Sequence, residues 1–149
     1  MPYWLMKSEP DEFSIQDLKK QGSGRWDGVR NYQARNFLRE MHESDLFFFY
    51  HSSCAEPGIA GIGRITRAAY PDPSALQSES PYHDPKASAE KNPWSAVDVG
   101  FVEAFATPLQ LARLKAAPAL QQLALVQKGS RLSVMPVSEG EWAAILALR

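Results

Sequence analysis

One unbroken apolar run, residues 46–50 (Leu-Phe-Phe-Phe-Tyr), constrains the fold more than any other segment. The run is too short for a helix, and the polar pair Ser44 and Asp45 introduces it. Successive side chains of a strand point to opposite faces, so an apolar strand needs apolar cover on both of them. The run therefore predicts a central strand of a sheet that is buried on both sides.

The other segments show short strand and helix patterns. We expect strands at 3–6, 59–70, 97–105 and 131–137, and helices at 14–22, 31–41, 108–115, 118–123 and 138–148. Gly61 and Gly63 lie in an apolar strand pattern, where small residues allow sharp curvature or close approach of another backbone. Because the helices do not alternate regularly with the strands, we predict an α+β fold built on a small curved sheet or open barrel.

Length and composition predict one domain. The chain has 149 residues, of which 44% are hydrophobic and 22% charged, and we expect residues 1–149 to share one core. The lone Cys54 cannot form an internal disulfide, which favours a reducing compartment. The first residues contain a charge and no long apolar segment, so we expect no membrane association and a cytoplasmic location.

The histidines and serines give little indication of catalysis. His42, His51 and His83 lack the spacing of zinc ligands. Ser52 and Ser53 follow His51, but adjacent strand residues point to opposite faces and no Gly-x-Ser-x-Gly turn surrounds them. We therefore expect no catalytic nucleophile, no metal and no cofactor.

A second distinctive segment, residues 26–32 (Trp-Asp-Gly-Val-Arg-Asn-Tyr), precedes a predicted helix. Trp26 lies in a polar, glycine-flanked turn, which is a poor place for a core residue, whereas Trp4 and Trp142 lie in apolar patterns and are expected in the core. An aromatic ring with polar groups beside it suits an unstacked base. Asp27 and Asn31 would contact the edge of that base, although both are also good helix-capping residues.

Two further features bear on the site. Residues 71–93 form a long, proline-rich loop that contains Tyr82 and His83 and ends beside Trp94, and loops of this length are often binding loops or lids. The net charge of −1 argues against binding nucleic acid mainly by bulk electrostatics. Basic residues between positions 19 and 39 form either one basic face, a solvated helix surface, or a protein-binding face that uses Arg35 and Arg39.

Long motifs support a resemblance to a known family. They are residues 3–10 (YWLMKSEP), 26–34 (WDGVRNYQA), 49–52 (FYHS), 57–61 (PGIAG), 69–73 (AYPDP), 82–85 (YHDP) and 129–134 (GSRLSV). The chain resembles the EVE domain, a member of the PUA-like superfamily that includes the YTH readers of methylated adenine in RNA. The resemblance implies a small β-barrel flanked by short helices, with an aromatic pocket for a modified base.

By the same likeness, Lys7, Ser8 and Trp26 occupy positions that help to form the YTH pocket. The YTH pocket has a serine where this chain has Asp27, so the base edge that it accepts should differ. A carboxylate favours an exocyclic amine or a ring N–H, as on cytosine or adenine. Candidates for a second aromatic wall are Tyr32, Trp94 and Phe101.

The sequence thus predicts a non-catalytic module that binds nucleic acid through a methylated cytosine or adenine. The alternative is an enzyme acting on a modified base or nucleotide, with Asp27 or His51 as general base. The candidate ligand-binding residues are Lys7, Ser8, Trp26, Asp27, Asn31, Tyr32, His51, Tyr82, Trp94, Arg131 and Ser133.

Overall fold

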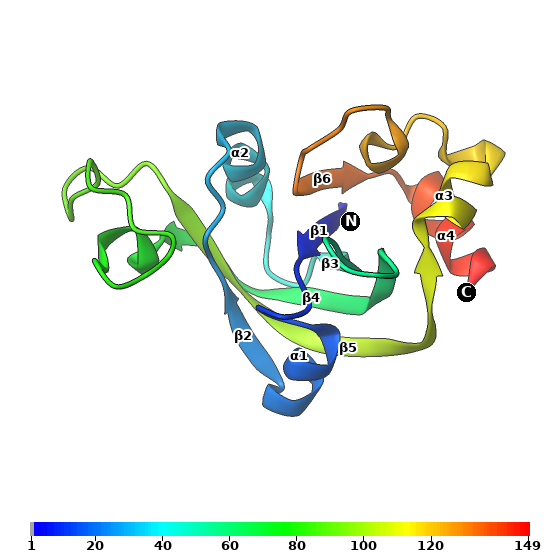
Figure 1. The fold of residues 1–149 in the computed structure, drawn as a ribbon, viewed down its shortest axis with the longest axis horizontal. Helices are drawn as coiled ribbons and strands as arrows, with labels where there is room; N and C mark the ends of the chain where they lie inside the picture. The colour runs from blue at the N-terminus through cyan, green and yellow to red at the C-terminus, as the bar shows by residue number, and fades with distance from the viewer. Residues whose placement is uncertain (1) are drawn as a thin grey trace.

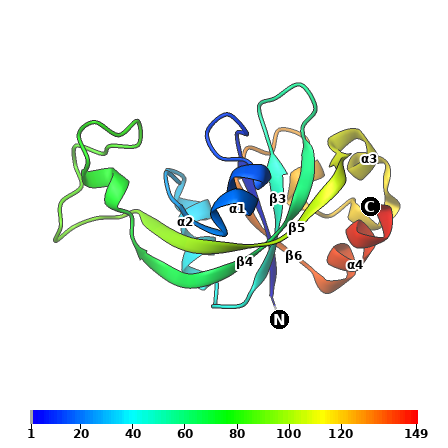
Figure 2. The ribbon, with the colours of Figure 1, turned by 90° about the horizontal axis from the view of Figure 1, so that it is seen from below.

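A six-stranded sheet forms the centre of the computed structural model, which describes residues 2–149 (Figures 1 and 2). Its strands are β1 (Tyr3–Ser8), β2 (Ser23–Trp26), β3 (Leu46–His51), β4 (Gly58–Pro71), β5 (Ser95–Gln110) and β6 (Val134–Val137). The strand order is β2-β5-β4-β3-β1-β6. Strands β1 and β3 are parallel, and every other neighbouring pair is antiparallel.

Short helices cover both faces of this sheet (Figure 2). They are α1 (Ile15–Gln21), α2 (Tyr32–Glu40), α3 (Leu111–Ala116) and α4 (Glu139–Leu148), with 3-10 turns η1 (Pro73–Leu76), η2 (Pro118–Leu120) and η3 (Ala124–Val126). Helices α1 and α2 pack on one face, while α3 and α4 pack on the other. The α+β prediction is therefore confirmed.

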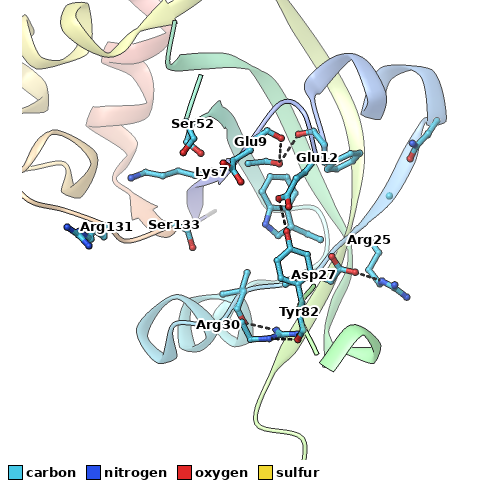
Figure 3. Close-up of a pocket in the computed structure, with 18 residues that line it drawn as sticks. Lys7, Glu9, Glu12, Arg25, Asp27, Arg30, Ser52, Tyr82, Arg131 and Ser133 are labelled. Carbon is cyan, nitrogen blue, oxygen red and sulfur yellow. Dashed lines mark hydrogen bonds and ion pairs between the residues drawn. The ribbon is translucent and has the colours of Figure 1, made fainter. Parts of the chain in front are cut away.

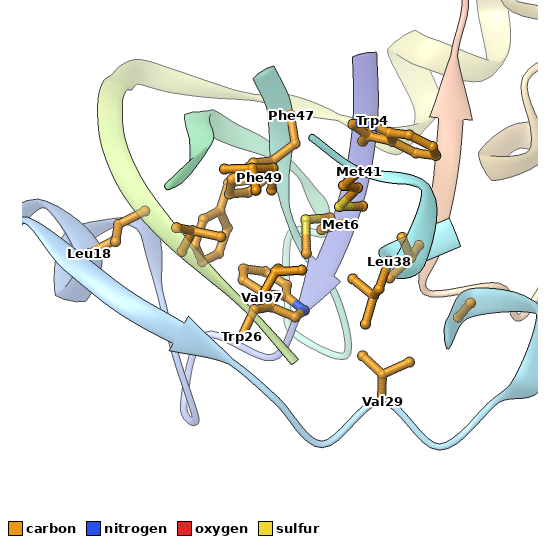
Figure 4. Packing of buried hydrophobic residues seen from close by; sticks show 14 of the residues in the cluster. Trp4, Met6, Leu18, Trp26, Val29, Leu38, Met41, Phe47, Phe49 and Val97 are labelled. Atoms are coloured by element: carbon orange, nitrogen blue, oxygen red, sulfur yellow. The ribbon is translucent and has the colours of Figure 1, made fainter. Parts of the chain in front are cut away.

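The central position predicted for residues 46–50 is confirmed, because β3 lies between β1 and β4. Phe47 and Phe49 belong to the apolar cluster under α1 and α2 (Figure 4), and Phe48 and Tyr50 belong to the cluster under α3 and α4. The alternation of the strand thus divides one apolar run between two cores. Gly63 permits this packing, since a Cβ there would lie 2.4 Å from the Phe47 ring.

The sheet is not closed into a barrel, which corrects that part of the prediction. Among residues 2–149 no pairing joins the two edge strands, β2 and β6. Helix α2 contacts both β5 and β6, so a helix rather than a hydrogen-bonded ladder spans the opening between the edges. The curvature itself comes from register shifts along the long β4–β5 pair.

One strand was not predicted, and two predicted helices differ from the structure. Residues 23–26 form β2, which the local sequence does not indicate, because this strand depends on tertiary pairing with β5 and Gly24 weakens its strand pattern. Residues 108–110 extend β5, so the helix predicted there begins only at Leu111. The helix predicted at 118–123 is reduced to the short turn η2.

The loop at residues 71–93 lies at the tip of the β4–β5 hairpin and contains the turn η1 (Figure 2). Arg35 and Arg39 of α2 both donate hydrogen bonds to the Pro93 carbonyl, each at 3.0 Å. These arginines therefore anchor the end of the loop instead of presenting a free basic face. No helix in the described part of the chain is long and apolar enough to cross a membrane.

Candidate functional site

A polar cleft of about 630 Å³ lies between the end of β2 and the segment that leads into β6 (Figure 3). The end of β1, the turn at residues 9–13 and the loop residue Tyr82 complete its walls. The cleft thus lies where the two sheet edges fail to meet. Its volume falls within the range of about 300–1,000 Å³ that is usual for ligand pockets.

Trp26 links this cleft to the core beneath it. The residue is only 5% exposed, and its ring meets Phe49 and Phe47 edge-on, with centroids 5.1 Å and 5.7 Å apart (Figure 4). The expectation that Trp26 is poorly placed for a core role is therefore wrong. Trp4 and Trp142 are core residues as predicted, at 4% and 6% exposure.

The indole N–H of Trp26 is a polar group at the bottom of the cleft, which we call its floor. Trp4 and Trp94 donate their indole N–H groups to Asp45 and Asp84, but Trp26 donates to no group in residues 2–149. No fully buried side-chain nitrogen or oxygen of these residues lacks a partner. The Trp26 N–H therefore reaches the surface, and the surface that Trp26 lines is the cleft.

Asp27 places a carboxylate at the rim of the cleft, directly after Trp26. Its Oδ2 atom accepts a hydrogen bond from Arg25 Nε at 2.9 Å, and the side chain is 27% exposed. A carboxylate has about four acceptor positions, so one such bond leaves acceptors for a ligand.

A buried carboxylate behind this rim holds the turn in place. Asp72 is fully buried and accepts hydrogen bonds from the Gly28 N–H, Arg30 Nη1, and both the N–H and the hydroxyl of Ser74. Burial alone would raise the pKa of Asp72, but the hydrogen bonds from Ser74, Gly28 and Arg30 hold it below its ordinary value. The charged form of Asp72 therefore fastens loop 71–93 to the segment after β2.

Tyr82 crosses the mouth of the cleft. Its hydroxyl donates to Glu12 Oε2 at 2.6 Å, and Arg30 donates two hydrogen bonds to its backbone carbonyl (Figure 3). Gly28, at φ +78°, lies directly beneath the ring, and a Cβ there would be 2.8 Å from it. Burial and the contact with Glu12 raise the pKa of Tyr82. The phenol therefore stays protonated and joins two walls of the cleft.

Charge is unequally distributed around the cleft. Asp27 lies beside Arg25, while Lys7 and Arg131 lie on the side of the cleft away from this pair (Figure 3). Burial lowers the pKa of Lys7, and no carboxylate of residues 2–149 pairs with its ammonium group. A ligand here would meet the Asp27–Arg25 ion pair on one side and, on the other, cations that pair with no carboxylate of residues 2–149.

The structure brings seven of the candidate residues to this cleft: Lys7, Ser8, Trp26, Asp27, Tyr82, Arg131 and Ser133. The hydroxyl of Ser8 donates to the Phe13 carbonyl at 2.7 Å, so it shapes the turn at residues 9–13. Their roles toward a ligand stay predictions.

The other four candidates do not line the cleft. Asn31 is the N-cap of α2 and accepts a hydrogen bond from the Ala34 N–H at 2.9 Å, as the capping alternative predicts. His51 Nε2 accepts a hydrogen bond from the Ile15 N–H at 3.1 Å, so its ring supports the start of α1. In both side chains, the acceptor atom is therefore already hydrogen-bonded to a backbone N–H of the protein.

Tyr32 and Trp94 stack on each other outside the cleft, with ring centroids 4.9 Å apart. Tyr32 is 59% exposed, and the Trp94 indole donates to Asp84 within the loop. Neither ring faces Trp26, and Phe101 packs against the core. The aromatic residues that line the cleft are Phe13, Trp26 and Tyr82.

Several lining residues were not predicted, among them Glu9, Glu12, Phe13 and Arg30. Arg30 stands within the 26–32 motif, and the two glutamates belong to an acidic cluster that precedes it in the sequence. Arg30 and Glu12 contact Tyr82, a residue far along the chain, so local sequence could not assign them. No cluster of three or more His, Cys, Asp or Glu residues that could hold a metal ion occurs in residues 2–149.

The EVE domain family model matches residues 2–148. The chain belongs to the EVE domain family. Human thymocyte nuclear protein 1 is 42% identical over 165 aligned positions, covering 98% of this chain and 73% of the relative. The resemblance drawn from the motifs is therefore confirmed.

Solved structures of similar proteins superpose on this EVE domain over almost its whole length. A Pseudomonas syringae protein is 70% identical with a TM-score of 0.97, and the match covers 98% of each chain. Human THYN1 protein, crystallised in complex with 5-methylcytosine-containing DNA, is 41% identical with a TM-score of 0.94, covering 99% of this chain and 97% of that one.

Proposed function

We propose that this EVE domain binds nucleic acid through a methylated base held in the cleft, with methylated cytosine as the preferred base. The observation that carries the proposal is the floor of the cleft, where the buried Trp26 ring presents an unpaired N–H beside the Asp27 carboxylate. An unstacked base needs an aromatic surface for its face and polar groups for its edge.

Cytosine fits this arrangement because its exocyclic amine is a donor that Asp27 accepts. The apolar side chains of Phe13 and Val29 also line the cleft and would contact a methyl group. The human relative that was crystallised with 5-methylcytosine-containing DNA supports cytosine over adenine. Tyr82 is proposed as the second aromatic wall, in place of the candidates chosen from the sequence.

The enzymatic alternative has less support at His51, because its Nε2 atom already accepts the Ile15 N–H and is not available as a general base. We propose binding without turnover, and product formation from a methylated nucleotide would overturn this. The cytoplasmic location, the relation to the PUA-like superfamily and the choice of DNA over RNA stay predictions.

Binding of oligonucleotides that differ at one base tests the proposal. We expect an oligonucleotide with 5-methylcytosine to bind more tightly than the same sequence with cytosine, adenine or N6-methyladenine, by direct titration in DNA and in RNA. Equal affinity for all four bases would contradict a modified-base pocket.

Asp27→Asn tests the edge contact within that pocket. The change keeps the size of the side chain and removes one charged acceptor, so we expect binding of the 5-methylcytosine oligonucleotide to weaken about three- to tenfold. The matched control is Asp11→Asn, since Asp11 is exposed on the neighbouring turn and does not line the cleft. Equal affinity of the two variants would remove Asp27 from the site.

A further inference from the structure

A second groove of about 400 Å³ lies on the other side of Lys7 from the cleft. It opens on the sheet face that α3 and α4 cover, and the turn at residues 127–130 forms its far wall. Lys7 lines both hollows, and the turn continues directly into Arg131 and Ser133 of the cleft. The groove and the cleft are therefore neighbours that share one wall.

The groove differs from the cleft in having cations but no carboxylates in its lining. Lys7, Lys115 and Lys128 line it, and its lining contains no Asp or Glu. None of these lysines forms an ion pair within residues 2–149. Figure 3 shows the Lys7 side chain extending away from Glu12 and Tyr82, on the side of Arg131. Three cations without counter-charges make the groove a site for an anion.

A buried tyrosine adds a directional donor to these cations. Tyr50 is only 3% exposed, yet its hydroxyl forms no hydrogen bond with residues 2–149. Since no fully buried side-chain oxygen of these residues lacks a partner, the hydroxyl reaches the surface, and the surface that Tyr50 lines is the groove. The Lys7 ammonium lies 5.9 Å from the centre of the same ring. Burial raises the pKa of Tyr50 to about 12, so the hydroxyl keeps its proton and can donate it.

We infer that this groove binds a backbone phosphate of the strand whose base enters the cleft, with Tyr50, Lys115 and Lys128 as its specific contacts. The inference rests on the proposed function for the choice of ligand. The cleft mixes carboxylates with cations, whereas the groove offers only cations together with the hydroxyl of Tyr50, which pairs with Lys7 across β1 and β3. Neighbouring phosphates of a strand carry one charge about every 3.4 Å, so a strand that places a base in the cleft has phosphates within reach.

The test measures binding as a function of salt concentration. Compared with the unaltered chain, we expect the double variant Lys115→Ala/Lys128→Ala to reduce the slope of log affinity against log salt by about 0.7–0.9, the contribution of one phosphate contact. The preference for 5-methylcytosine over cytosine should stay unchanged. The matched control is Lys19→Ala/Lys20→Ala, which removes the same charge from exposed positions on α1 that do not line the groove.

Tyr50→Phe tests the hydroxyl separately. It removes a group that has no protein partner, so the fold should be retained while oligonucleotide binding weakens about threefold or more. An unchanged salt slope in the lysine variant, together with unchanged affinity in Tyr50→Phe, would overturn the inference. Tight binding of inorganic phosphate alone, with no change in the oligonucleotide slope, would overturn it in favour of a free-phosphate site.

Failure of the proposed function would give a different result. If the unaltered chain binds methylated and unmethylated oligonucleotides equally, the base pocket is wrong. The salt slope of the lysine variant on the unmethylated oligonucleotide then still decides whether the groove contacts phosphate.

Discussion

Trp26 serves the core and the cleft with different parts of one side chain. Its ring fills the space between Phe47 and Phe49, and its N–H is left without a protein partner at the cleft floor. Truncation to alanine would remove both contributions, and the loss of a buried tryptophan costs about 3–5 kcal/mol of stability. Trp26→Ala therefore cannot separate ligand binding from folding.

Trp26→Phe separates the effect on ligand binding from the effect on folding. Phenylalanine keeps an aromatic ring in the core and removes the N–H donor, so we expect binding of a 5-methylcytosine oligonucleotide to weaken about two- to tenfold, as for one hydrogen bond. Titration at a temperature well below unfolding measures this. Trp142→Phe is the matched control, because Trp142 is equally buried but packs against Phe48 on the opposite face. Equal losses in the two variants would mean that the Trp26 N–H does not contact the base.

At the scale of elements, the cleft depends on how its walls are held. The turn at residues 9–13 and helix α1 form one wall, and His51 at the end of β3 supports them by accepting the Ile15 N–H. The opposite wall is fastened by Asp72 and Arg30. Ligand-binding surfaces held by buried hydrogen bonds from several elements lose little entropy when a ligand binds.

The hydrogen bond at His51 predicts a pH dependence of stability. Burial lowers the pKa of His51 below its ordinary value of 6.5, while Asp17 acts weakly in the opposite direction. Because the unfolded chain takes up the proton first, this stabilisation is complete above pH 6.5 and is lost as the pH falls from 6.5 through the lower pKa of the folded state. We therefore expect the free energy of unfolding to fall as the pH is lowered through that window.

Denaturant unfolding between pH 7.5 and pH 5 measures this loss. In His51→Gln, which keeps an acceptor but does not titrate, the loss should be smaller. His83→Gln serves as the control, since His83 is exposed in the loop and should leave the profile unchanged. A profile that is unaltered in His51→Gln would show that other groups cause the dependence.

For the whole molecule, the sequence determined the strongly patterned parts of the fold. The apolar run at 46–50 predicted the central strand, and the patterns at 14–22 and 138–148 predicted two helices that the structure contains. Strand β2 and the open sheet were not predictable in this way, because they depend on pairing with β5 and on helix α2 crossing the gap.

The residues of the cleft were also only partly predictable, because tertiary contacts decide which of them come together. The aromatic ring of Trp26 and the acceptors of Asp27 predicted a base-binding pair, and both residues do line the cleft. Asn31 and Tyr32 follow them too, but the start of α2 directs their side chains to a cap and to Trp94. The course of the backbone after Gly28 decides which residues of the motif face the cleft. Asp72, in the distant loop, sets that course by accepting the Gly28 N–H.

If the walls of the cleft are preformed in this way, a bound methylated oligonucleotide should stabilise the entire fold. A ligand that binds only the folded state at 100 times its Kd adds about 2.7 kcal/mol, which for a chain of this size raises Tm by about 5–10 °C. We expect the 5-methylcytosine oligonucleotide to raise Tm by more than its unmethylated counterpart at equal concentration, measured by differential scanning calorimetry. The difference should shrink in Asp27→Asn and persist in Asp11→Asn. An equal shift with both oligonucleotides would show that binding energy comes from the backbone alone and that the cleft does not read the methyl group.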